Sequence, residues 1–138
     1  MSRLVKLFLI LCALAFIYIG LATFHNPVAA LAPVEIMPLT VSAFNELRAS
    51  YGGLQIGIGL LLLAGALLPS LTRPALLAQA LMVGGLAAGR LVSIGLDGLP
   101  NGFVLMLLAL ESTIALLSAV FLVWGKDPAV PPDHGQGK

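Results

Sequence analysis

Four long runs of apolar residues dominate the chain, and short polar breaks separate them. The runs cover residues 4–22, 44–68, 74–94 and 103–124. A hydrocarbon layer of about 30 Å requires about 20 apolar residues of α-helix. The runs are continuously apolar rather than alternating, which favours helices over a closed barrel. The pattern therefore predicts an all-α fold, a bundle of four transmembrane helices.

The breaks contain residue types that end or begin helices. Residues 97–102 read Asp-Gly-Leu-Pro-Asn-Gly, a series rich in turn-forming residues. Pro74 follows a polar break and suits the first turn of a helix. We expect one transmembrane domain over residues 1–125. Residues 126–138 hold three prolines and few apolar residues, which predicts a disordered cytoplasmic tail.

Composition supports a membrane location. Charged residues make up 9% of the chain, against about 25% in soluble domains. Hydrophobic residues make up 59%, and the mean hydropathy is +1.06. Thirteen charged side chains cannot cover a water-facing globule of this length, so the apolar excess must face lipid. The net charge of +1 gives no indication of a nucleic-acid partner.

Cysteine and histidine usage gives no indication of a metal or other cofactor. Cys12 is the single cysteine, and no Cys/His spacing typical of a zinc site or a disulfide framework is present. Leu9-Ile10-Leu11 precede Cys12, and these large residues do not suit a lipidation site. We expect neither a cofactor nor a metal.

The basic residues indicate the orientation. Arg3, Lys6, Arg73 and Lys126 fall on one side of a four-span arrangement. Lys and Arg in short loops mark the cytoplasmic side, so both termini should be cytoplasmic. An alternative is that the first run is a secretory signal with a cleavage site at Ala30-Leu31-Ala32. Three helices would then remain.

Glycines four residues apart predict close helix packing. Gly53 and Gly57 form one G-x-x-x-G motif in the second run, and Gly85 and Gly89 form another in the third. Small residues at this spacing let helix backbones approach closely in lipid. We expect these glycines to close the bundle internally, with a dimer contact as the alternative.

Polar residues within the spans form the candidate site. Ionisable side chains at membrane depth are costly and usually face the protein interior. A helix rises 1.5 Å per residue, so Arg90 and Glu111 should differ in depth by about 6 Å, which an arginine can bridge. We expect one cluster near the non-cytoplasmic side. Its predicted members are Glu46, Arg48, Tyr51, Gln55, Arg90, Ser93, Asp97 and Glu111.

Two interpretations of this cluster remain open. The residues are either structural pairs that fix helix register, or a site in which Arg48 and Arg90 receive an anion or a polar head group. The loop of residues 23–43, which holds His25 and Glu35, either lies in the membrane interface or forms a lid over the cluster.

Residues 46–55, Glu-Leu-Arg-Ala-Ser-Tyr-Gly-Gly-Leu-Gln, resemble the signature of an uncharacterised bacterial family, domain of unknown function 4345. Residues 89–93, residues 97–100 and Glu111 are similar to its remaining features. The resemblance implies a small four-helix inner-membrane protein with a layout broadly like that of DoxX-like proteins. It implies no particular activity.

Three functions compete. The favoured one is a non-enzymatic membrane module, either an accessory subunit or a binder of a lipid or small anion, with a membrane protein or a second copy as possible partner. The second is a small membrane enzyme acting on a lipid-soluble substrate, with Glu111 as general acid or base. The third is a transporter, which four spans without an inverted repeat do not favour.

Overall fold

The computed structural model describes residues 2–124, and all of its regular elements are helices. Four continuous helical stretches are long and apolar enough to cross a membrane: Arg3–His25, Val41–Leu67, Pro69–Asp97 and Gly102–Trp124. The predicted all-α, four-helix fold is confirmed, and the helix ends lie close to the predicted ones. The predicted tail, residues 126–138, lies outside the described residues.

The elements follow one another with few irregular residues between them. In chain order they are α1 (Arg3–His25), α2 (Pro27–Leu31), η1 (Ala32–Val34), α3 (Val41–Leu47), η2 (Arg48–Gly53), α4 (Leu54–Leu67), η3 (Pro69–Leu71), α5 (Thr72–Asp97) and α6 (Gly102–Trp124). Elements η1 and η3 are 3₁₀ turns, whereas η2 is a π-helix between α3 and α4. Elements α3, η2 and α4 together form the second spanning helix.

Two of the membrane helices start at polar capping residues that lie just before the apolar runs. The Thr40 hydroxyl accepts a hydrogen bond from the Ala43 N–H at 3.1 Å. Asn101 Oδ1 accepts one from the Val104 N–H at 3.0 Å. Such N-caps satisfy backbone donors that a helix leaves without an internal partner. The second and fourth spanning helices therefore begin at capping residues rather than at the first apolar residue.

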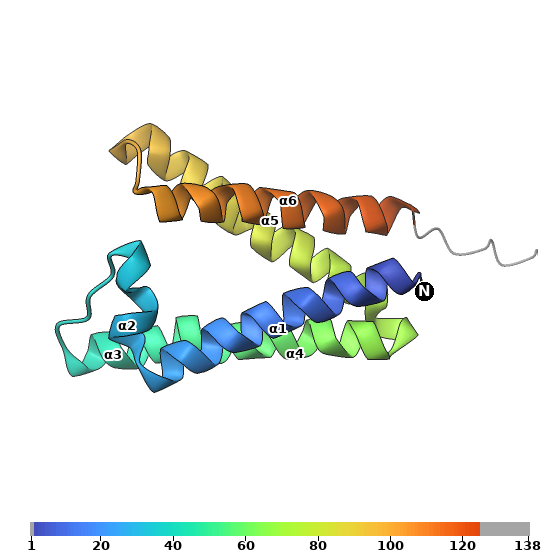
Figure 1. The fold of residues 1–138 in the computed structure, drawn as a ribbon, viewed down its shortest axis with the longest axis horizontal. Coiled ribbons are helices and arrows are strands. Elements are labelled where there is room, and N and C mark those ends of the chain that lie inside the picture. The colour runs from blue at the N-terminus through green and yellow to red at the C-terminus, as the bar shows by residue number, and fades with distance from the viewer. Residues whose placement is uncertain (1, 125–138) are drawn as a thin grey trace, which may run out of the picture.

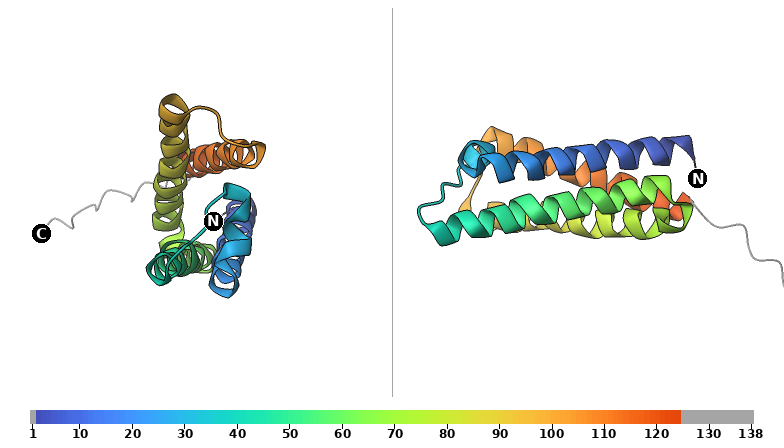
Figure 2. Two further views of the ribbon diagram at one scale, coloured as in Figure 1. Left: turned by 90° about the vertical axis from the view of Figure 1, so that its left-hand side faces the viewer. Right: turned by 90° about the horizontal axis from the view of Figure 1, so that it is seen from below.

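The helices form two antiparallel pairs. Helix α1 packs along α4, and α5 packs along α6 (Figure 1). Contacts between α4 and α5 join the two pairs beside η3, and in Figure 1 the pairs diverge toward the end at which α2 lies. The start of α1 and the end of α6 lie at the same end of the bundle (Figure 2). Four antiparallel crossings require this placement.

The tightly packed core lies where α1, α4 and α5 meet. Leu9, Ala13, Leu62, Ala66 and Ala75 are fully buried there. Helix α6 contacts this core through Phe121, whose ring meets the ring of Phe8 edge to face with centroids 5.3 Å apart. Helix α1 is thus an integral part of the core.

Large apolar side chains cover the outer surface. Leu96 is 80% exposed and Trp124 is 79% exposed, and similar residues lie along every long helix. Monomeric soluble proteins rarely expose continuous apolar surface on this scale. Lipid is the environment that suits this surface.

The closest helix contacts involve glycines other than those predicted. A Cβ at Gly20 would lie 2.6 Å from Ile56 Cγ1, and a Cβ at Gly59 would lie 2.6 Å from Ile17 Cγ1. These two glycines allow α1 and α4 to approach closely.

The two G-x-x-x-G motifs do not form this seam. Nothing lies within 4 Å of a Cβ built at Gly57, Gly85 or Gly89, and Gly53 has only ordinary contacts from 3.9 Å. The expectation that these motifs close the bundle internally is wrong. Successive helical residues are rotated by about 100°, so the stripe of Gly53 and Gly57 points away from α1 when Gly52 and Gly59 face it.

Candidate functional site

Arg90 of α5 and Glu111 of α6 form a two-point ion pair, here called the Arg90–Glu111 fork. Arg90 Nε donates to Glu111 Oε2 at 2.7 Å, and Arg90 Nη2 donates to Glu111 Oε1 at 2.8 Å. The side chains are 24% and 12% exposed. Both residues lie about 10 Å or more from the nearer helix end, at 1.5 Å per residue. The predicted meeting of these two residues is observed.

The fork leaves donors of Arg90 available. A guanidinium carries five N–H groups, and Glu111 engages two of them. Among the described residues, the other three have no hydrogen-bond partner. Arg90 also lines an open pocket of about 350 Å³, here called the Arg90 pocket. The lining residues are Gly85, Leu86, Gly89, Arg90, Ser93, Ile94, Pro100 and Val104.

Glycines form part of the pocket wall. No atom lies within 4 Å of a Cβ built at Gly85 or Gly89, so side chains at these positions would enter open space. The pocket is mostly apolar, and Arg90 and Ser93 contribute its polar side chains. An apolar cavity with a few converging polar groups is the usual form of a site for a small ligand.

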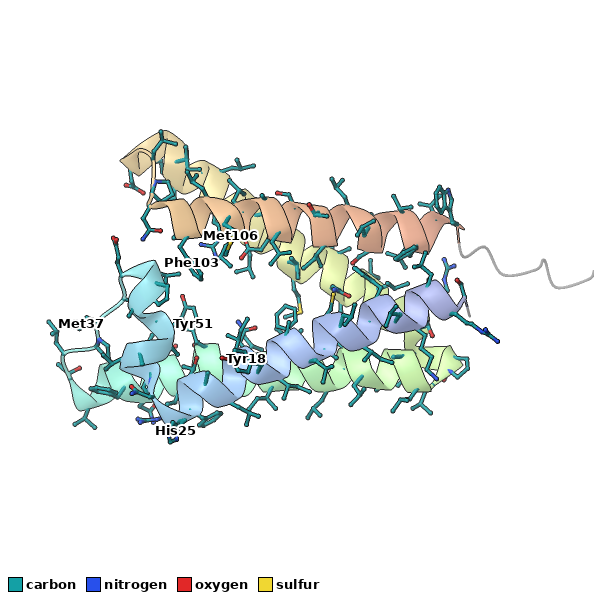
Figure 3. All side chains as sticks on the ribbon, viewed as in Figure 1. Tyr18, His25, Met37, Tyr51, Phe103 and Met106 are labelled. Carbon is teal, nitrogen blue, oxygen red and sulfur yellow. The ribbon has the colours of Figure 1, made fainter. Side chains whose placement is uncertain are left out.

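Tyr51 approaches the fork from the other helix pair. It belongs to η2, and it lies within electrostatic range of the Arg90 guanidinium. In Figure 3 its ring points from the α1/α4 pair toward the side of Phe103 and Met106. Gln55 follows one turn later, and its buried Oε1 atom has no partner among the described residues.

Arg48 lies apart from the fork. Its Nε donates to the Phe24 carbonyl oxygen of α1 at 3.2 Å, and its guanidinium carbon lies 5.7 Å from the centre of the Phe44 ring. Within residues 2–124 no hydrogen bond or ion pair therefore joins Arg48 to Arg90 or Glu111 in the expected cluster. Arg48 opens the π-helix η2 and turns toward the last turn of α1, where carbonyl oxygens lack helical partners.

The remaining predicted residues form local pairs. The Ser50 hydroxyl donates to Glu46 Oε1 at 2.7 Å, one turn along the same helix. The Ser93 hydroxyl donates to Asp97 Oδ2 at 3.0 Å in the same way. Neither Glu46 nor Asp97 bonds to the fork, so the direct pairing is confined to Arg90 and Glu111.

A connection across the open end of the bundle was not predicted. Asn101 Nδ2 donates to the Pro33 carbonyl oxygen at 3.1 Å and to Glu35 Oε1 at 3.0 Å. We call these two hydrogen bonds the Asn101 latch. They tie the segment of α2 and η1 to the start of α6, and Figure 1 shows α2 between the two helix pairs at this end. The first loop thus includes a short helical segment that reaches across toward α6.

Sequence signals for the latch are present but weak. Asn101 precedes a helix after a turn, which identifies it as a cap and not as a long-range donor. Glu35 has a φ of 60°, the one positive value among the described non-glycine residues. Nothing local in the sequence requires that conformation. Within residues 2–124 no three His, Cys, Asp or Glu side chains are grouped closely enough to hold a metal ion.

A family model matches residues 4–122, and its description is domain of unknown function, DUF4345. The chain belongs to this family. The matched region includes the Arg90–Glu111 fork, Tyr51 and the Asn101 latch, so all of them are parts of the DUF4345 domain. Comparison with curated proteins and with solved structures gave no match.

Proposed function

We propose that this DUF4345 protein is a non-enzymatic membrane module that binds a lipid or small anionic ligand in the Arg90 pocket. One observation carries the proposal. Arg90 is held by Glu111 at two points, yet three of its N–H donors have no partner among the described residues and the side chain lines an open, largely apolar pocket.

The chemistry of the pocket defines what it would bind. Arginine keeps its charge and presents donors in a fixed fork, which suits carboxylate or phosphate oxygens. Glu111 offsets the charge of Arg90, so a partly charged head group is sufficient. The apolar side chains Leu86, Ile94 and Val104 provide contact for a hydrocarbon portion. An amphiphile with an oxygen-rich head group meets both requirements.

Native mass spectrometry of the protein in lipid nanodiscs tests the proposal. Wild type should retain a ligand that Arg90→Gln loses, because glutamine lacks the charge and the remaining donors. Arg3→Gln is the matched control, since it removes an arginine at the start of α1, at the other end of the bundle from Arg90. Equal retention by wild type and Arg90→Gln would remove the basis for a binding function. A co-purifying membrane protein in place of a ligand would instead indicate an accessory subunit.

The proposed location is a bacterial inner membrane with both termini cytoplasmic. Supporting it, Arg3 and Lys6 at the start of α1 and Arg73 at the start of α5 belong to the same end of the bundle. In a Cys12→Ser background, an impermeant thiol reagent applied from outside should label Leu99→Cys and not Ser2→Cys. The reverse pattern would invert the proposed orientation.

The enzyme alternative has less support. A general acid or base must exchange a proton with its substrate, and both carboxylate oxygens of Glu111 accept hydrogen bonds from Arg90. A turnover assay on lipid-soluble substrates that shows loss of rate in Glu111→Gln, with ligand retention unchanged, would favour the enzyme over the binding module.

A further inference from the structure

A second open pocket surrounds Arg48, on the junction of α1 and α3. Its volume is about 450 Å³, and we call it the Arg48 pocket. Its lining residues are Phe24, Val41, Phe44, Asn45, Arg48 and Ala49. It shares no lining residue with the Arg90 pocket. We propose that the Arg48 pocket binds the phosphate group of an anionic membrane phospholipid.

The charge of Arg48 is what distinguishes this pocket. Arg90 is paired with Glu111, whereas Arg48 has no ion pair among the described residues. Glu46 is the acidic residue nearest to Arg48 in the sequence, and the Ser50 hydroxyl donates to it. An arginine without a neighbouring carboxylate attracts a fully charged anion more strongly than an arginine whose charge a carboxylate already offsets. Arg48, not Arg90, is therefore the better receptor for a phosphate.

The Arg48 guanidinium is held in place by two contacts that leave most of its N–H donors available. Its Nε bonds to the Phe24 carbonyl oxygen, and its plane is steadied by the Phe44 ring. The four N–H groups on Nη1 and Nη2 have no partner among the described residues. Arginine presents such a pair of nitrogens in the geometry that phosphate oxygens accept in parallel. Capping α1 thus uses only one of the five donors of Arg48.

The surroundings favour a lipid over free phosphate. Arg48 lies seven residues inside the start of α3, a rise of about 10 Å, which is the same distance from a helix end as Arg90 has in α5. Beside this end, Met37, Leu39 and Val41 are 71%, 86% and 87% exposed. Met37 projects at the outer tip of the loop in Figure 3. Apolar side chains with this exposure suit contact with lipid at the end of the bundle where the Arg48 pocket lies.

The lining combines the two chemistries that a phospholipid carries. Arg48 and Asn45 supply polar groups, and Phe24, Phe44 and Val41 supply apolar contact. Free phosphate would use only the polar part. The inference is independent of the Arg90 pocket, because Arg90→Gln should leave phospholipid binding at Arg48 unchanged.

Native mass spectrometry after reconstitution in phosphatidylcholine nanodiscs with added phosphatidylglycerol tests the assignment. Wild type should retain phosphatidylglycerol selectively. Arg48→Gln should retain about tenfold less, the equivalent of losing one charge-assisted hydrogen bond. Arg3→Gln should match wild type. Equal retention by wild type and Arg48→Gln, or an equal loss in Arg3→Gln, would overturn the proposal.

A second variant separates binding from folding. Asn45→Asp places a negative charge in the pocket and keeps the bond between Arg48 and the Phe24 carbonyl, so it should lose phosphatidylglycerol while its helical content and unfolding midpoint stay at wild-type values. Retention by a folded Asn45→Asp protein would contradict the proposal. Full displacement of the lipid by inorganic phosphate would show that the pocket takes free phosphate, and the lipid assignment would then be wrong.

Discussion

Arg90 and Glu111 meet through two parallel hydrogen bonds of 2.7 and 2.8 Å that join α5 to α6. A two-point contact between a planar guanidinium and a carboxylate restricts both distance and rotation. The fork therefore fixes the register of the α5/α6 pair at the end where the two helix pairs diverge. It also places the free side of Arg90 beside the pocket.

Each single substitution in the fork should destabilise the protein strongly, and the double substitution should cost less than the sum of the two single ones. Arg90→Met and Glu111→Met each leave a charge without its partner, at a cost of about 3 kcal/mol. The double variant should cost clearly less than the sum of the two, because no lone charge remains. Denaturant unfolding in mild detergent measures these free energies. Strictly additive losses would show that the two residues do not act as a pair.

The close approach of α1 and α4 should depend on Gly59. Its Cβ would meet Ile17 Cγ1 at 2.6 Å and the Ala13 carbonyl oxygen at 2.9 Å. We expect Gly59→Ala to lower the free energy of unfolding by about 1–3 kcal/mol, through overpacking. Gly57→Ala is the matched control on the same helix. With open space around it, this change should be neutral or stabilise by up to about 1 kcal/mol. A larger loss at Gly57 than at Gly59 would contradict the described packing.

The Asn101 latch should hold the segment of α2 and η1 against α6. Asn101→Asp keeps the acceptor that caps α6 but replaces the donor to Pro33 and Glu35 with a carboxylate. We expect faster amide hydrogen exchange over residues 27–36, with little change in α6. Asn45→Asp makes the same chemical change outside the latch and, measured in detergent without added phospholipid, should leave this exchange unaltered. Unchanged exchange in Asn101→Asp would mean that the latch does not hold the segment.

Gln79 should reduce the stability of the bundle. It is fully buried, the Cys12 thiol is the polar group beside its amide, and within residues 2–124 neither amide atom makes a hydrogen bond of standard geometry. A buried amide without a partner costs about 1–3 kcal/mol. Methionine has a similar shape without that cost, so Gln79→Met should raise the free energy of unfolding by about 1–2 kcal/mol. A destabilised Gln79→Met protein would indicate that the amide is solvated or bonded.

The spans and the central ion pair could be predicted from the sequence. Span length follows from the thickness of the bilayer, and few residues other than apolar ones occupy the runs. The match between Arg90 and Glu111 follows from helical rise, because the two residues face each other across a short turn at similar depths. Periodicity and depth were therefore sufficient for α5 and α6.

The inward faces of the helices could not be predicted with the same success. In lipid both the buried and the exposed side of a helix are apolar, so the pattern that reveals the inner face of a soluble helix is absent. Because hydropathy does not mark the inner face, the spacing of Gly53 with Gly57 and of Gly85 with Gly89 was the remaining signal, and it indicated the wrong faces. The π-helix η2 also changes the angular spacing that a regular α-helix would give between Arg48 and α4, and Arg48 bonds to the Phe24 carbonyl oxygen.

Ligand retention by Gly89→Leu tests the central claim most directly. The leucine side chain would extend into the Arg90 pocket, where nothing lies within 4 Å of a Cβ, and it would leave the Arg90–Glu111 fork in place. Gly57→Leu adds the same side chain to open space outside the pocket. By native mass spectrometry, wild type and Gly57→Leu should retain the ligand and Gly89→Leu should lose it. Equal retention in all three proteins would contradict a binding site beside Arg90.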